Sequence, residues 1–220
     1  MTTFGIATLK ERENTFIKTI GSIYNQVDHI IAVLNLYETV PDWLKGLPKV
    51  KTVIGDNSLG DAGKFLEVER CDDYYFSGDD DLYYPATYVS DMINAIDKYH
   101  CIVTLHGKIF AKRPIYSYHK SFTTNIHCLR ACERDTEVDV GGSGVMAFNT
   151  KDIKLNISEF KYPNMADIWV GKIAHEQGVK IMALAHQRNY LRYLHPKGDT
   201  IWHLTKKDPY QTEVLNSFLK

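Results

Sequence analysis

The chain has 220 residues, a length that suggests one large domain or two small ones and that can bury about 70% of the unfolded surface. It carries 26 basic and 27 acidic residues, and this net charge of −1 excludes a strongly basic nucleic-acid-binding protein. No stretch approaches the roughly 18 apolar residues of a membrane span, and the N-terminus lacks the pattern of a signal peptide. We therefore expect no nucleic-acid polymer as a partner and no membrane span.

Short apolar runs alternate with helical patterns in the first half of the chain. The patterns predict strands at residues 4–9, 27–34, 50–54, 73–77 and 101–105. They predict helices at residues 11–24, after Gly63, and from Pro85 to Tyr99. Strands that alternate with helices are typical of a mainly parallel sheet covered on both faces, so the sequence predicts an α/β fold.

The alternation is interrupted in the second half. Residues 106–140 form a basic, aromatic and histidine-containing stretch with little periodicity, which predicts a functional segment or an antiparallel excursion. A strand at 145–148, a helix at 165–177 and a last strand at 179–184 follow. The tail, residues 186–220, is polar and irregular, and we expect it to be flexible. Because no linker divides the chain, we expect one domain over residues 1–220.

Three adjacent carboxylates follow the fourth predicted strand, at Asp79, Asp80 and Asp81. Like charges about 4 Å apart repel by about 1 kcal/mol per pair even in water, and a divalent cation makes such a cluster favourable. Asp79 and Asp81 are alternate residues that can offer oxygen ligands to Mn²⁺ or Mg²⁺. The alternative is a solvated acidic turn, but open α/β sheets bind ligands at strand carboxyl ends. The sequence favours a metal site.

Two glycine-containing segments are candidate ligand loops. The segment Gly60 to Phe65 is no Walker A loop, but it can place backbone N–H groups and Lys64 near an anion; a helix-capping loop is the alternative. Gly142, Ser143 and Gly144 precede a strand instead of a helix, which excludes a dinucleotide-binding fingerprint. We interpret this second segment as a loop close to a ligand, with a plain turn as the alternative.

Asp167 begins the predicted helix at 165–177. The positive end of the helix dipole keeps such a carboxylate ionised and available as a base. The alternative is a capping box in which Asn164 is the N-cap. In the tail, His203 is a candidate third metal ligand.

The four cysteines are scattered, which fits a reduced cytoplasmic protein. Cys128 and Cys132 are four residues apart and His127 is adjacent, a spacing that suggests a metal site. No second cysteine pair completes it, so the sequence favours free thiols.

Together these features resemble nucleotide-sugar-dependent glycosyltransferases of the GT-A type, similar to family 2, over about residues 4–185. The chain also looks similar to the small glycosyltransferase domains of large algal viruses. The resemblance implies a Rossmann-like GT-A domain with a nucleotide-binding half at about 1–105 and an acceptor-side half at about 106–185. It is carried by residues 5–12, Gly63-Lys64, Asp79-Asp80-Asp81 and the helix with Asp167.

The resemblance also implies a UDP-sugar donor and roles for the donor-side residues. Thr8 and Arg12 would lie beside the nucleotide, and Asp56 would meet the base. Lys64 would neutralise phosphate, and Asp80 would lie near the ribose.

On the metal and acceptor side, the resemblance implies that Asp79, Asp81 and His203 hold Mn²⁺ or Mg²⁺ against the diphosphate. Gly142, Ser143 and Gly144 would border the donor sugar. Asp167 would be the base that deprotonates the acceptor hydroxyl, although Ala166 stands where the family often has a second acid.

The leading hypothesis is therefore a metal-dependent glycosyltransferase that acts on a glycan, glycoprotein or glycolipid. A sugar nucleotidylyltransferase is the enzymatic alternative, but the N-terminal segment lacks a glycine-rich basic loop for a triphosphate. A carbohydrate-binding module with a structural cation is the non-enzymatic alternative, and the α/β pattern argues against it.

Overall fold

The computed structural model describes residues 1–110, 113–196 and 209–219. Its helices are α1 (Glu13–Ile23), α2 (Asp42–Lys45), α3 (Tyr88–Tyr99), α4 (Ala166–Glu176) and α6 (Tyr210–Phe218). Its strands are β1 (Thr2–Leu9), β2 (His29–Asn35), β3 (Val50–Gly55), β4 (Tyr74–Gly78), β5 (Leu82–Tyr83), β6 (Ile102–Thr104), β7 (Gly107–Ile109), β8 (Thr124–Ile126), β9 (Thr136–Glu137), β10 (Val140–Gly141), β11 (Val145–Asn149), β12 (Ile181–Ala183) and β13 (Arg192–Tyr193).

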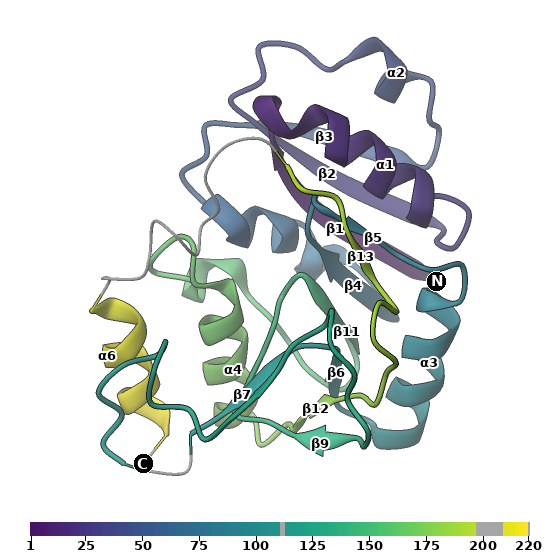
Figure 1. The fold of residues 1–220 in the computed structure, drawn as a ribbon. Helices are drawn as coiled ribbons and strands as arrows, with labels where there is room; N and C mark the ends of the chain where they lie inside the picture. Colours follow the sequence, from purple (N-terminus) through teal and green to yellow (C-terminus); the bar gives the residue numbers. More distant parts are fainter. Residues whose placement is uncertain (111–112, 197–208, 220) are drawn as a thin grey trace.

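An eight-stranded sheet forms the centre of the molecule, in the order β3-β2-β1-β4-β11-β6-β12-β9 (Figure 1). The first four strands of this order are parallel, and β11 runs antiparallel between β4 and β6. Strand β2 is buried at six of its seven residues. Continuous burial of this kind requires helices or loops on both faces of a sheet.

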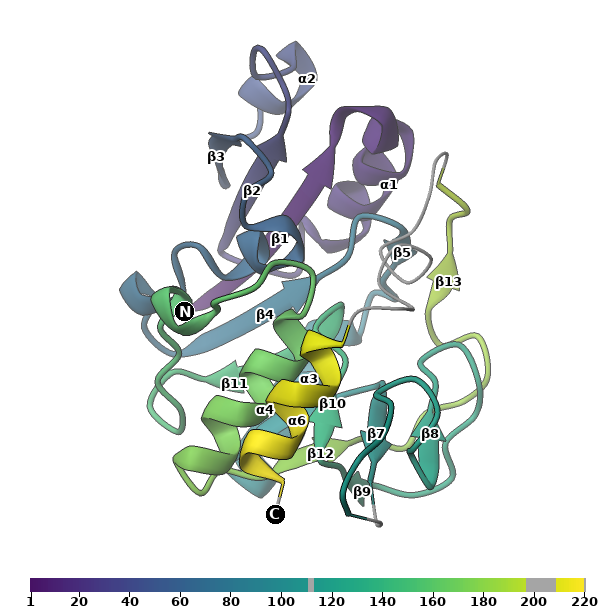
Figure 2. The same cartoon turned by 90° about the vertical axis from the view of Figure 1, so that its left-hand side faces the viewer.

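The two faces of the sheet support two hydrophobic cores. Helices α1 and α3 pack on one face, where Phe16 and Met92 join Phe4 and Ile6 of β1. Helices α4 and α6 lie side by side on the other face (Figure 2), and Ile168 lies there in the same cluster as β4 and β11 residues. The predicted α/β architecture with a mainly parallel sheet is confirmed.

The stretch at 106–140 contains the predicted antiparallel excursion. Strands β10, β7 and β8 form a separate three-stranded antiparallel sheet, and β9 adds an antiparallel strand to the edge of the main sheet. This excursion lies near the carboxyl ends of β6 and β12, so its residues can reach the same edge of the sheet as the Asp cluster.

The prediction of a helix after Gly63 is wrong, because the chain forms short 3-10 turns over Gly60–Phe65 and Val68–Arg70. The carbonyl oxygen of Lys64 accepts a 2.6 Å hydrogen bond from the Tyr75 hydroxyl instead of one from the fourth following amide. This buried tyrosine therefore holds the turn against the sheet.

Helix α6 was not predicted, and it lies within the tail that was expected to be irregular and flexible. Val214, Leu215 and Phe218 of this helix are buried against α4. Earlier in the tail, β13 pairs with β5. Both segments are too short for a clear periodic pattern, and packing against the domain stabilises them.

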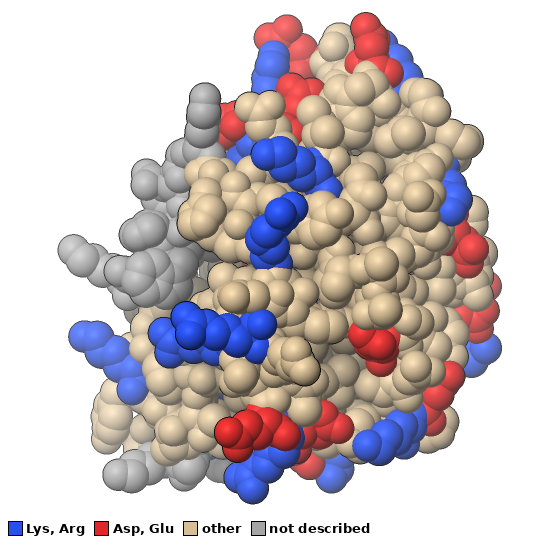
Figure 3. Space-filling model, turned by 45° about the vertical axis from the view of Figure 1, so that its right-hand side comes forward, with Lys and Arg blue, Asp and Glu red and all other residues tan. Residues whose placement is uncertain are grey.

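The surface of one side of the molecule carries charges of both signs. In Figure 3, Lys and Arg side chains form several separate groups, and Asp and Glu side chains lie between and around them. Among the described residues, no helix is sufficiently long and apolar to cross a membrane.

Candidate active site

The parallel strands of the central sheet end at a common edge. The register pairs Leu9 of β1 with Asn35 of β2, and Asn35 with Gly55 of β3, while β4 ends beside β1. The segments that follow these strands therefore meet at one edge of the sheet, which is where α/β proteins bind ligands.

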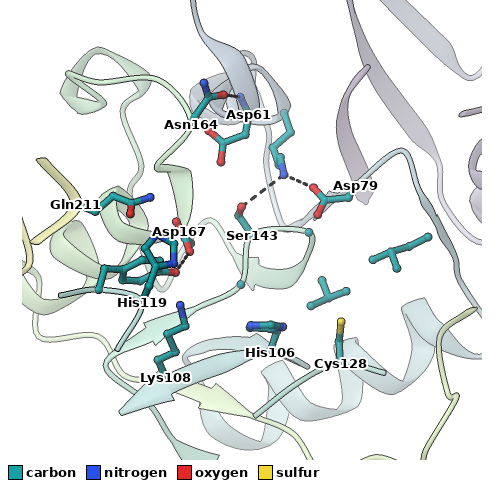
Figure 4. A pocket seen from close by; sticks show the side chains of 16 residues that line it. Asp61, Asp79, His106, Lys108, His119, Cys128, Ser143, Asn164, Asp167 and Gln211 are labelled. Carbon is teal, nitrogen blue, oxygen red and sulfur yellow. Dashed lines mark hydrogen bonds and ion pairs between the residues drawn. The ribbon is translucent and has the colours of Figure 1, made fainter. Parts of the chain in front are cut away.

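A pocket of about 290 Å³ opens beside the end of β4 (Figure 4). It is lined by residues from the turn after β4, the 3-10 turn after β3, the antiparallel excursion, the glycine loop before β11, α4 and α6. The predicted site residues in its lining are Lys64, Asp79, Gly142, Ser143, Gly144 and Asp167. The fold thus brings together six residues that span more than a hundred positions of the sequence.

Lys64 and Asp79 form an ion pair at this pocket. The lysine is only 4% exposed, whereas the Asp79 side chain is 45% exposed. Burial alone lowers the pKa of Lys64, but the charges of Asp79 and Asp61 outweigh it, and the pKa is raised. Lys64 is therefore a fixed positive charge, and its Nζ also lies 3.4 Å from the Ser143 hydroxyl.

The glycine loop fits closely against the Asp cluster. A Cβ atom at Gly144 would lie 2.0 Å from a carboxylate oxygen of Asp79, so any other residue there would displace this carboxylate. The Tyr84 hydroxyl accepts a hydrogen bond from the Asp79 amide and donates one to the Gly144 carbonyl. The buried tyrosine thereby connects the two segments.

Asp80 is buried and does not line this pocket, and its carboxylate has two partners. The Thr8 hydroxyl donates to one carboxylate oxygen at 2.7 Å, and Arg12 Nη1 donates to the other at 3.1 Å. Burial raises the pKa of Asp80, and Arg12 opposes this effect. The structure thus brings together three predicted donor-binding residues, and both carboxylate oxygens of Asp80 already have partners within the protein.

Asp81 is the least neutralised carboxylate of the cluster. Its side chain is 15% exposed, and Arg12 Nη1 lies 3.8 Å from it. Burial, followed by the charges of Asp79 and Asp80, raises the pKa of Asp81 to about 7. Such a set of carboxylate oxygens has the chemistry that Mn²⁺ and Mg²⁺ prefer in proteins. The other predicted ligand, His203, lies outside the described residues.

Asp167 is the second residue of α4, and its carboxylate faces the pocket (Figure 4). The buried Tyr118 hydroxyl donates a short hydrogen bond to Asp167 Oδ2. The alternative capping box does not form, since Met165 is the N-cap and makes no side-chain cap. Instead Asp61 accepts a 3.2 Å hydrogen bond from the Ala166 amide and caps the helix from a distant segment.

Asp56 is separate from this pocket. It is exposed on the loop after β3 and accepts a 2.9 Å hydrogen bond from the Ser58 amide. These bonds with Ser58 lower the pKa of Asp56. It does not line the pocket described above.

Several pocket residues were not identified from the sequence. Burial raises the pKa of Asp61 to about 6, partly opposed by Lys64. Lys108 Nζ lies 3.5 Å from the centre of the Tyr118 ring, and burial lowers the pKa of this lysine. Burial also lowers the pKa of His106 to about 3, so this imidazole is neutral at pH 7.

Most of these residues come from the stretch between β6 and β10, which was predicted to be a functional segment or an antiparallel excursion. Only the spacing of His127, Cys128 and Cys132 was singled out there. The basic, aromatic and histidine-containing composition of this stretch was the sequence signal that could have pointed to these pocket residues. Gln211 reaches the pocket from α6, and no sequence signal pointed to it.

Comparisons with known proteins show which fold this is. No family model matches the chain, and neither does any curated protein. Solved structures of S. aureus TarS do match. TarS 1–349 in complex with UDP-GlcNAc aligns with 100% of this chain and 72% of its own, at 11% identity and a TM-score of 0.58.

Two further TarS structures give similar results. A second structure of TarS 1–349 aligns with 85% of this chain at 11% identity and a TM-score of 0.51, and another TarS structure aligns with 99% at 12% identity and a TM-score of 0.55. This chain spans 58% and 42% of those two proteins. At such low identity the similarity shows the fold alone.

Proposed function

We propose that this protein is a metal-dependent glycosyltransferase that transfers a sugar from a UDP-sugar to a hydroxyl group of a glycan, glycoprotein or glycolipid. The fold is similar to that of TarS, a glycosyltransferase with a structure in complex with UDP-GlcNAc. The observation that carries the proposal is a single pocket that holds Lys64, Asp79 and Asp167 together. These residues supply a cation, a metal-ligand carboxylate and a base.

The donor side of the reaction requires that the charge of the leaving diphosphate be offset. Asp79 and Asp81 would hold Mn²⁺ or Mg²⁺, which when bound supplies charge for this purpose. Lys64 is held beside Asp79 by the ion pair and contributes a second positive charge. Thr8 and Arg12 hold the Asp80 carboxylate and so help to orient its two neighbours in the chain.

The acceptor side requires a base for the incoming hydroxyl. Asp167 lies in the first turn of α4, where the positive end of the helix dipole favours the ionised carboxylate. The hydrogen bond from Tyr118 fixes Oδ2, and Oδ1 accepts a 3.0 Å bond from the Ile168 amide. In the proposed reaction, Asp167 takes the proton of the acceptor hydroxyl as the sugar–oxygen bond forms and the bond to the diphosphate breaks.

Donor binding is tested by calorimetry with UDP in the presence and absence of Mn²⁺. We expect Mn²⁺-dependent binding by the wild type and loss of that dependence in Asp79→Asn. Asp72→Asn is the matched control, because Asp72 is an exposed carboxylate near the start of β4. Absence of UDP binding by the wild type, or unchanged binding by Asp79→Asn, would contradict the proposal.

Transfer is tested by incubation with a panel of UDP-sugars and acceptors, with released UDP as the readout. Asp167→Asn should retain UDP affinity but lose most of the transfer activity. A parallel incubation with UTP and sugar 1-phosphates tests the nucleotidylyltransferase alternative, which releases pyrophosphate instead. Full transfer by Asp167→Asn would eliminate its role as the base.

A further inference from the structure

A second group of metal-ligating side chains lies in the excursion, apart from the Asp cluster. The ligand atoms of His106, His127 and Cys128 all lie within 4.8 Å of one another. His106 and Cys128 also line the pocket, and the two imidazole rings have their centres 5.0 Å apart. No step of the proposed transfer uses these side chains.

The antiparallel register of β7 and β8 explains why this group forms. Gly107 pairs with Ile126, so the preceding residue, His106, and the following residue, His127, are the next opposite positions of the ladder. Cys128 comes directly after His127 and is 8% exposed. Residues from two strand ends thus converge, although they are about twenty positions apart in the sequence.

We propose that His106, His127 and Cys128 bind a zinc ion at the wall of the pocket. Two imidazole nitrogens and one thiolate form a ligand set that selects Zn²⁺, whereas the oxygen ligands of the Asp cluster suit Mn²⁺ and Mg²⁺. In a tetrahedral zinc site the ligand atoms lie about 3.3–3.6 Å apart. The observed group therefore needs side-chain movements on the order of 1 Å to close around the ion.

A further histidine of this region has an unsatisfied ring nitrogen. The backbone of His186 bridges to that of Cys132, in the loop that also carries Cys128. The Nδ1 of His186 is 2.7 Å from the Leu184 carbonyl, while its buried Nε2 has no hydrogen-bond partner among the described residues. His127 Nδ1 accepts a 3.3 Å bond from the Leu129 amide. The unsatisfied atom is therefore His186 Nε2, and a buried polar atom without a partner is costly.

The structure also separates the two cysteines that the sequence placed in one motif. Cys132 Sγ lies 3.3 Å from the Arg134 carbonyl oxygen and is not part of the group. The backbone of Cys132 pairs with that of His186, and this bridge fixes the loop that carries Cys128. Cys132 is therefore a matched control for substitution of Cys128.

The test uses the full chain, stripped of metal with a chelator and titrated with Co²⁺, which reports a bound thiolate through a charge-transfer absorption band. We expect saturation of this band at one equivalent and its displacement by Zn²⁺. The band should be lost in Cys128→Ser and kept in Cys132→Ser. It should also persist in Asp79→Asn, which separates this site from the Asp cluster and from the proposed function.

Absence of the band in the wild type would overturn the proposal without any variant. Persistence of the band in Cys128→Ser would also overturn it. His106→Gln and His127→Gln provide a second measurement: each should weaken competition with a colorimetric zinc chelator at least tenfold, and unchanged zinc affinity in both would refute the assignment. Circular dichroism of each variant confirms that it is folded.

Discussion

Ionisation of the Asp81 carboxylate destabilises the folded protein, so removal of its charge should stabilise the metal-free form. The pKa of Asp81 is about 7 in the folded chain, whereas the ordinary pKa of an aspartate is 3.8. A difference of about three units, at about 1.4 kcal/mol per unit, corresponds to at most about 4 kcal/mol. Asp81→Asn should therefore be more stable than the wild type at pH 8, by up to about 10 °C in Tm.

The stability difference between the wild type and Asp81→Asn should depend on pH. Between about pH 4 and 7 the folded state keeps a proton on Asp81 that the unfolded state has lost, so wild-type stability falls as the pH rises through this window and is level above it. We expect the curves of wild type and Asp81→Asn to meet near pH 4 and to separate by pH 8. Urea unfolding in a chelator at each pH measures the difference.

Asp72→Asn is the control for this series, since it removes an exposed carboxylate outside the cluster. Mn²⁺ should raise the Tm of the wild type at pH 8 and have little effect on Asp81→Asn, because the carboxylate is a proposed ligand. If Asp81→Asn were less stable than the wild type at pH 8 without metal, the reasoning about its burial would be refuted.

Three further substitutions test other parts of the structure. Gly144→Ala would place a Cβ 2.0 Å from Asp79 and should weaken Mn²⁺-dependent UDP binding at least tenfold by calorimetry; unchanged affinity would contradict the close fit. In Gly21→Ala, the added Cβ on α1 would have no atom within 4 Å, so the variant should be more stable by about 0.5–1 kcal/mol in urea unfolding; a loss of stability would contradict this expectation. Tyr118→Phe removes the hydrogen bond to Asp167 and should lower transfer about tenfold or more at unchanged UDP affinity; full activity would show that this bond does not position the base.

The order of the main elements could be predicted from the sequence. Buried strands and amphipathic helices leave apolar patterns with their own periods, and these patterns located β1 to β4, α1, α3 and α4 to within a few residues. The same local information placed Asp79 and Asp81 at a strand end and Asp167 at a helix start. Each of these positions depends only on the residue's neighbours along the chain.

Local patterns were insufficient where a distant contact decides the structure. The segment after Gly63 has a helical pattern, but the buried Tyr75 hydroxyl binds the Lys64 carbonyl and leaves a 3-10 turn. In the tail, α6 is short, and burial of Leu215 against the α4 side stabilises it. The alternative in which Asn164 caps α4 is wrong, because Asp61 of the distant turn accepts the Ala166 amide hydrogen bond at that position.

The sequence by itself determined an α/β chain with carboxylates at the end of its fourth strand and a further carboxylate at a helix start. Only the tertiary structure decided which of these residues meet, because the turn after β3 packs beside β4 and is hydrogen-bonded to the start of α4. This packing brings Lys64, Asp79 and Asp167 to one pocket. It also paired Cys128 with His106 instead of Cys132, since strand register, and not spacing along the chain, sets which side chains lie opposite one another.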